Sequence, residues 1–366
     1  FIQLVLILVA FSAFAQKKEA KAPDNWFNLD PKKNKVNGIG TERAYSELLK
    51  NKKSNTVIVA VIDGGTDIYH EDLKDIIWTN EDEIPNNGID DDHNGYIDDI
   101  HGWNFIGGHI PDSNVKEDTY ELTRLYAHLN SLYGKVDKSK VSPQKKTEYE
   151  KYERVKKVYE EEKERYTKGM HRISEIAKGV EAVLTKIGKQ EPTVGEVENF
   201  KPTNDREEKG RAALLSALTK SIKIEMTNVK PDISFIITMS VLSQTGTADS
   251  CKKMLSSFIE YYSKYLNYHL NTDFDTRKTV VLDNYDKIND ISYGNNNVKG
   301  PSAGHGSHVA GIIAAMRNNN IGIKGVADNV RIMVLRVVPD GDERDKDVAN
   351  AIRYAADNGA KVINMS

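Results

Sequence analysis

Two stretches of the sequence place a side chain that can exchange a proton at a position suited to chemistry. The first is the apolar run from Val57 to Ile62, which ends on Asp63 and is followed by two glycines. The run is too short for a helix and rich in β-branched residues, so it predicts a strand buried on both faces of a parallel sheet. The carboxyl end of such a strand is where open α/β sheets place their ligand crevice. On its own, the pattern fits a turn aspartate equally well.

The second stretch is GHGSHVAGIIAAMR, residues 304–317. His305 lies between Gly304 and Gly306, and the residues that follow predict a buried helix with small side chains. A histidine held by glycines at the start of a helix is expected to face a cleft rather than a core. An imidazole and a carboxylate in such places could work as an acid–base pair.

Together and in this order, IDGGTDIYHEDL and HGSHVAGIIAA resemble the motifs that carry the acid and the base of subtilisin-like serine proteases. The resemblance covers about residues 57–110 and 282–366. It implies an α/β fold built on a doubly wound parallel sheet. The strand–helix alternation after His305, with strands expected at 331–338 and from 361 and a helix at 347–358, fits the same fold class.

In the mechanism that the resemblance implies, His305 takes a proton from a serine hydroxyl, and Asp63 orients the imidazole and stabilises its charged form. No Gly-Thr-Ser nucleophile motif occurs in the 366 residues. We therefore expect the serine and an asparagine that stabilises the oxyanion to lie beyond Ser366, and residues 1–366 alone to be inactive. By resemblance, Ser366 itself begins a substrate-binding segment that lines the primary specificity pocket.

Two residues depart from the family's usual motifs. Gly64 stands where serine or threonine is usual after the acid, and Ser307 replaces a threonine between the two histidines. Neither change removes an atom of the triad. We expect His308 to have a structural role, packing under the start of the helix.

An acidic loop at residues 80–105 predicts a calcium site. Oxygen ligands at alternate positions, with Gly95 at the sixth, let a short loop wrap a hard cation. The expected ligands are Asp90, Asp92, Asn94, the backbone carbonyl of Tyr96, and Asp98. The twelfth position holds His101 instead of a bidentate glutamate, so Asp99 or a residue elsewhere would have to complete the shell. The alternative is an acidic turn without an ion.

A second calcium site is implied by the resemblance alone. Asp72, nine residues after Asp63, matches the carboxylate of the family's strong site. Asn319 and the carbonyls of Ile321 and Ile323 match the ligand loop after the histidine helix. The loop is one residue longer here than in the family.

The middle of the chain, residues 112–280, predicts a helical module inserted between a first part (56–111) and a second part (281–366) of the catalytic domain. Apolar residues recur at a helical period from 152 to 187 in a strongly charged background, and further helical patterns cover 211–226 and 253–270. Compact members of the family need only a few tens of residues between the acid and the base. A solvated face explains the charges most simply, and recognition of a protein partner is the alternative.

The N-terminal residues predict export. Residues 1–16 are apolar and close on Ala13-Phe14-Ala15-Gln16, which is typical of a secretory signal peptide whose basic n-region is missing. Residues 17–55 then form the N-terminal segment of a secreted or periplasmic protein. No cysteine follows the cleavage site, so we expect no lipid anchor, and the single Cys251 is expected to be buried.

The composition limits the classes of partner that we expect this chain to bind. The chain has 51 Lys and Arg residues against 54 Asp and Glu residues, a net charge of −3, which gives no electrostatic case for nucleic acid or an anionic membrane. We expect protein or peptide substrates. The acidic residues Asp340, Asp342, Glu343 and Asp345 suggest a preference for basic residues in those substrates. A non-catalytic binding module of the same fold, or a structural calcium-binding protein, would be the alternatives to a protease.

Overall fold

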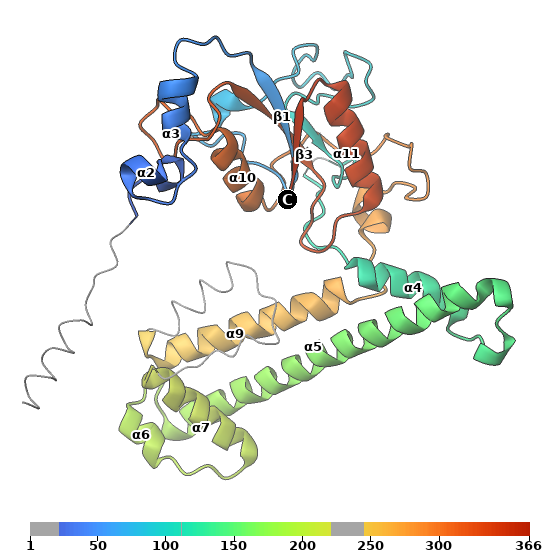
Figure 1. Ribbon diagram of the computed structural model, residues 1–366. Coiled ribbons are helices and arrows are strands. Elements are labelled where there is room, and N and C mark those ends of the chain that lie inside the picture. Colours follow the sequence, from blue (N-terminus) through green and yellow to red (C-terminus); the bar gives the residue numbers. More distant parts are fainter. Residues whose placement is uncertain (1–21, 111, 221–244) are drawn as a thin grey trace, which may run out of the picture. The chain divides into compact units, whose positions relative to one another are not determined.

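The computed structural model describes residues 22–110, 112–220 and 245–366, and the chain divides into two compact units (Figure 1). The sheet unit takes in the described residues up to Lys116, together with Val280–Val338 and Glu343–Ser366. The helical unit consists of Glu117–Thr279 and the four residues Pro339–Asp342. The predicted signal peptide, residues 1–16, lies outside the described residues.

The sheet unit is built on four parallel strands in the order β2-β3-β1-β4. Their bounds are Val57–Asp63 (β1), Gly102–Asn104 (β2), Val330–Arg336 (β3) and Val362–Met365 (β4). Consecutive side chains of a strand point to opposite faces, and an apolar run without alternation therefore needs cover on both sides. β1 has this sequence and lies between β3 and β4, at the centre of the sheet.

Helices supply that cover on both faces. Ala60 and Ile62 belong to a core shared with α11 (Asp345–Asp357), whereas Val59 and Val61 belong to a core shared with α10 (Gly304–Ala314). Figure 1 shows α10 and α11 on opposite sides of the sheet. The predicted α/β class with a parallel sheet covered on two faces is confirmed.

Most predicted boundaries hold to within two residues. β1 includes Asp63, so the carboxylate is carried by the strand itself. β3 ends at Arg336, two residues before the predicted end, and α11 begins at Asp345, two residues before the predicted start. In the N-terminal segment, α2 spans Pro31–Asn34 and α3 spans Thr41–Arg43.

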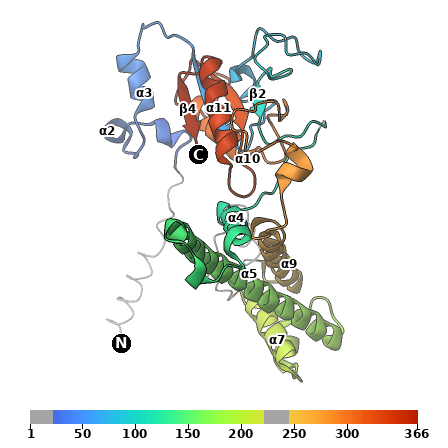
Figure 2. The same cartoon turned by 90° about the vertical axis from the view of Figure 1, so that its right-hand side faces the viewer.

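The helical unit contains the long helix that the periodicity predicts. The helices are α4 (Glu121–Tyr133), α5 (Lys146–Ile187), α6 (Val194–Asn199), α7 (Asp205–Leu218) and α9 (Ala248–Lys264). The two views in Figures 1 and 2 show α7 and α9 alongside α5. Part of the helix predicted at 211–226 lies outside the described residues.

Two kinds of core hold these helices together. One end of α5 packs aliphatic side chains such as Val180 and Val183 against α7 and α9, and Cys251 is buried there as predicted. Towards the other end the core is made of tyrosines: the rings of Tyr126 and Tyr159 stack with centroids 4.1 Å apart. Tyrosine buries a large ring while its hydroxyl keeps a polar partner, which suits a helix with a mostly charged sequence.

Local signals in the sequence set the ends of two of these helices. α5 stops at Gly188, which adopts a left-handed conformation with φ of 76°. α6 starts with a capping box between Thr193 and Glu196. In the part of the chain that the structure describes, no helix combines the length and the apolar character needed to cross a membrane.

Candidate active site

Asp63 and His305, which are far apart in the sequence, meet at the carboxyl end of β1. Nδ1 of His305 lies 3.0 Å from Oδ1 and 2.9 Å from Oδ2 of Asp63. Asp63 is buried, with 2% of its surface exposed, whereas the His305 side chain is 66% exposed. A carboxylate accepts hydrogen bonds, so this contact places a proton on Nδ1 and leaves Nε2 as the ring nitrogen that faces away from Asp63.

The backbone around this pair fixes both side chains. The N–H of Gly64 donates to Oδ1 of Asp63 at 2.7 Å, which orients the carboxylate. On the other side, a Cβ at Gly306 would lie 2.2 Å from the carbonyl oxygen of Gly65 and 3.2 Å from Oδ1 of Asp63. Only glycine at position 306 lets the start of α10 approach the end of β1 this closely.

The two departures from the expected motifs have local explanations. A Cβ at Gly64 would lie 3.2 Å from the carbonyl oxygen of Val338 and 3.4 Å from that of Ser302, so a larger residue would crowd both segments. Ser307 is engaged: its Oγ accepts the N–H of Asp67 at 2.8 Å and so links α10 to the loop after β1. The expectation for His308 is wrong, since its side chain is exposed rather than packed under the helix.

Ser366, predicted to bind substrate, follows β4 and is exposed. Its hydroxyl donates to Oδ1 of Asn364 at 3.0 Å. The structure therefore shows Ser366 in contact with Asn364, two residues earlier in β4.

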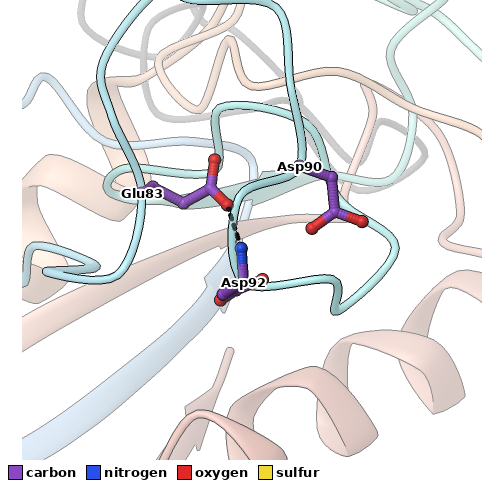
Figure 3. A group of neighbouring side chains, drawn as sticks. All are labelled: Glu83, Asp90 and Asp92. Atoms are coloured by element: carbon purple, nitrogen blue, oxygen red, sulfur yellow. Dashed lines mark hydrogen bonds between the residues drawn. The ribbon is translucent and has the colours of Figure 1, made fainter.

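The acidic loop brings Asp90 and Asp92 together, as the sequence predicts. One carboxylate oxygen of each lies in a group within 4.8 Å, and the third member is Glu83, which the sequence analysis missed (Figure 3). Asn94 contacts two members of this group, because its N–H donates to Asp90 and to Asp92, at 3.0 Å in each case. The structure thus gathers three carboxylates at this loop.

The other residues predicted at this loop have contacts of their own. Both carboxylate oxygens of Asp98 accept backbone N–H groups, from Asn87 at 3.1 Å and from Gly88 at 2.9 Å. The Tyr96 ring lies in the core of the sheet unit, and its backbone carbonyl stays a predicted ligand. Asp99, one candidate to complete the shell, is fully buried and accepts hydrogen bonds from Asn80, Asn94 and the Tyr354 hydroxyl. Its role is to orient amide side chains of the loop.

Glu83 is the carboxylate that fits a cation. Its Oε1 accepts the N–H groups of Asp91 and Asp92, at 2.8 and 3.2 Å. Its Oε2 is buried and has no hydrogen-bond partner among the described residues, and Glu83 as a whole is 5% exposed. Burial raises the pKa of the Glu83 carboxyl, and the nearby Asp99 and Asp92 add to this effect. A buried, unpartnered carboxylate oxygen beside two further carboxylates matches the donor set of a hard divalent cation.

The second predicted calcium site is partly assembled. The amide of Asn319 donates to Oδ1 of Asp72 at 2.6 Å, and the N–H of Ile321 donates to Oδ1 of Asn319 at 3.0 Å. Asp72 is buried, at 4% exposure. Asp72 and Asn319 are thus neighbours, as the resemblance implies, and their contact is a direct hydrogen bond; Ile321 and Ile323 follow in the same loop.

Two of the four acidic residues predicted to favour basic substrates already have partners within the helical unit. Asp340 forms an ion pair with Lys264, and Oδ2 of Asp342 accepts the N–H of Glu121 at 2.8 Å, at the start of α4. Asp340 and Asp342 therefore already contact groups of this chain.

Comparisons with known proteins find related sequences. A family model described as the subtilase family matches residues 54–366. A thermophilic serine proteinase of Bacillus sp. (strain AK1) is 54% identical over 63 residues, which are 17% of this chain and 16% of that protein. Thermitase of Thermoactinomyces vulgaris is 52% identical over 64 residues, 17% of this chain and 23% of thermitase.

A third relative, the cell wall-associated protease of Bacillus subtilis (strain 168), is 43% identical over 74 residues, 20% of this chain and 8% of that protein. The aligned part of the chain therefore spans less than a quarter of each of these relatives.

Proposed function

Because this chain belongs to the subtilase family, we propose that the complete protein is an exported serine endopeptidase that hydrolyses peptide bonds with an Asp–His–Ser triad. The observation that carries the proposal is the pair formed by Asp63 and His305, in which a buried carboxylate contacts Nδ1 of a largely exposed imidazole. In this proposal the serine nucleophile and an oxyanion-stabilising asparagine come from beyond residue 366, and residues 1–366 alone are inactive.

The geometry supports different roles for His305 and Asp63 in the proposed reaction. Nε2 of His305 takes the proton of the serine hydroxyl as the serine attacks the peptide carbonyl, and later returns it to the leaving amine. Asp63 does not itself take up the proton. It holds the ring in the tautomer with the proton on Nδ1 and stabilises the imidazolium as it forms. Because Asp63 is buried and the Gly64 N–H fixes its carboxylate, little reorganisation is needed during the reaction.

The direct test is hydrolysis of an unfolded protein such as casein by the purified complete protein. We expect cleavage that a serine-directed phosphonate abolishes and that Asp63→Ala reduces by about 10⁴-fold. Cleavage that resists the phosphonate, or that Asp63→Ala leaves unchanged, would exclude the triad.

We also propose that Glu83, Asp90 and Asp92 hold a structural calcium ion. The support is the buried Oε2 of Glu83, which has no partner among the described residues, in a group of three carboxylates. Bound calcium would neutralise the repulsion among these groups and brace the loop between β1 and β2. No chemical step of the proposed reaction involves it.

Calcium titration followed by calorimetry, with the thermal unfolding midpoint as a second readout, tests this site. We expect calcium to raise the unfolding midpoint of the complete protein, and Glu83→Gln to weaken binding at this site by tenfold or more. The control is Glu81→Gln, an exposed glutamate of the same loop. Equal calcium affinity in Glu83→Gln and in the control would show that Glu83 is not a ligand of the calcium ion.

A further inference from the structure

A fully buried arginine lies beside the proposed catalytic acid. Arg336 ends β3, is paired in register with Asp63 of β1, and is 1% exposed. Burial lowers the pKa of its guanidinium to about 10, so the group stays charged at neutral pH. Among the described residues, no carboxylate forms an ion pair with it. An uncompensated buried charge destabilises a fold, and an apolar side chain of similar volume would usually serve stability better.

The guanidinium makes three hydrogen bonds, all to neutral oxygens. Nε donates to the carbonyl of Gly64 at 2.9 Å, Nη1 to Oδ1 of Asn104 at 3.0 Å, and Nη2 to the carbonyl of Val115 at 2.5 Å. The planar fork of arginine can reach these separate acceptors at fixed angles, which a lysine ammonium cannot do. The side chain therefore ties the end of β2 and a later loop to the residue that follows Asp63.

The Gly64 residue links this arginine to the catalytic pair. Its carbonyl accepts from Arg336, and its N–H donates to Oδ1 of Asp63, whose carboxylate holds Nδ1 of His305. The loop before α10 touches the same side chain, because a Cβ at Gly300 would lie 2.2 Å from Nε of Arg336. The segment after the acid and the segment before the base thus meet on one guanidinium.

We propose that Arg336 is a positioning residue for the Asp63–His305 pair, acting through the carbonyl of Gly64. The inference rests on the proposed protease function, since its kinetic consequence needs a reaction. A purely structural arginine would affect only the stability of the sheet unit. A positioning residue also sets the geometry of the pair, and a misplacement of about 1 Å in such a site costs on the order of 10²-fold in rate.

The test compares Arg336→Lys and Arg336→Met in the complete protein, at a temperature where every variant is folded by circular dichroism. We expect kcat for a peptide substrate to fall by about 10²-fold in both, with KM changed less than threefold. The second readout is the downfield proton resonance of Nδ1 of His305, which reports the hydrogen bond to Asp63 and needs no turnover. We expect it to shift or broaden in both variants.

The matched control is Lys346→Met. Lys346 is another buried cation of the sheet unit, 2% exposed and 2.7 Å from Asp283, and it makes no contact with the pair. Its loss should lower the unfolding midpoint while kcat and the resonance stay as in the wild type.

Wild-type kcat and an unshifted resonance in Arg336→Lys would overturn the proposal, whatever the change in stability. If Arg336→Met does not fold, the result for Arg336→Lys alone tests the positioning role. If the wild-type protein hydrolyses no peptide, the protease function fails, and the resonance still tests the positioning role.

Discussion

In both units a glycine lets two backbone segments come into contact, but the contact has a different consequence in each unit. In the sheet unit, Gly306 lets α10 approach Gly65, and the contact brings His305 onto Asp63. In the helical unit, Gly179 of α5 and Gly210 of α7 face each other: a Cβ at Gly210 would lie 2.1 Å from the carbonyl carbon of Gly179. The first contact assembles two proton-exchanging groups, whereas the second only packs helices. Close backbone contact therefore indicates chemistry only where side chains suited to it meet.

The largest expected effect comes from removing the base. In the complete protein, His305→Ala should lower kcat/KM by about 10⁴-fold or more, because His305 is the group that accepts the serine proton in the proposed mechanism. The matched control is His308→Ala, an exposed histidine of the same helix, which should keep wild-type activity. Steady-state kinetics on a peptide substrate measure both. Similar losses in the two variants would mean that the helix, and not the imidazole at 305, matters.

The second prediction tests the glycine contact in the sheet unit. Gly306→Ala places a methyl group 2.2 Å from the Gly65 carbonyl, so α10 must move and carry His305 away from Asp63. We expect kcat to fall by about 10²-fold. Gly304→Ala is the control, since a Cβ there meets nothing within 4 Å. If both variants keep the wild-type kcat, the close approach does not set the geometry of the pair.

The third prediction tests the corresponding contact in the helical unit. Gly210→Ala should destabilise that unit by about 1–3 kcal/mol through overpacking against α5. Gly195→Ala in α6 has open space around its Cβ, so it should stabilise by about 0.5–1 kcal/mol through helix propensity. Urea unfolding followed by helical circular dichroism measures both. A gain in stability from Gly210→Ala would show that α5 and α7 are not in contact at these glycines.

The smallest effect is a dependence of stability on pH in the helical unit. The hydrogen bond from Lys186, followed by that from the N–H of Thr203, lowers the pKa of Glu207 from 4.5 to about 2. A carboxyl whose pKa is lowered by folding stabilises the fold above its unfolded pKa, and that contribution disappears as pH falls from about 4.5 to about 2. Glu207→Gln should therefore be less stable than the wild type at pH 6 and equally stable near pH 2.

Urea midpoints at a series of pH values check this prediction, with the exposed Glu181→Gln as the control. The difference between wild type and Glu207→Gln should narrow only in that acidic window. A difference that stays constant from pH 6 to pH 2 would contradict the assigned partner contacts of Glu207.

The sheet unit could be predicted well because its signals are local. An apolar β-branched run predicts β1, and glycines around His305 predict an exposed imidazole at a helix start. The cluster of carboxylates in the acidic loop was predicted only in part. Asp90 and Asp92 follow an alternating pattern, but Glu83 stands in the run Glu81–Asp82–Glu83, and nothing in that run distinguishes it from its exposed neighbours. Its burial is set by the path of the whole loop.

Arg336 and the helical unit show what local signals miss. Arg336 lies inside the apolar run RIMVLRVV, where a charged side chain is unusual. The sequence analysis did not consider it as a candidate functional residue. The helical period predicted α5. It could not predict that Pro339–Asp342, far along the chain, belong to the helical unit, because the hydrogen bond from the Asp118 N–H to the Asp340 carbonyl is a long-range pairing.

The most direct test of the account is covalent labelling of the complete protein with a fluorophosphonate, followed by mapping of the modified residue by mass spectrometry. The account predicts a single labelled serine beyond residue 366, and a labelling rate that falls by several orders of magnitude in His305→Ala. Labelling at an equal rate in the wild type and in His305→Ala, or none in the wild type, would contradict the proposal that Asp63 and His305 serve a serine nucleophile.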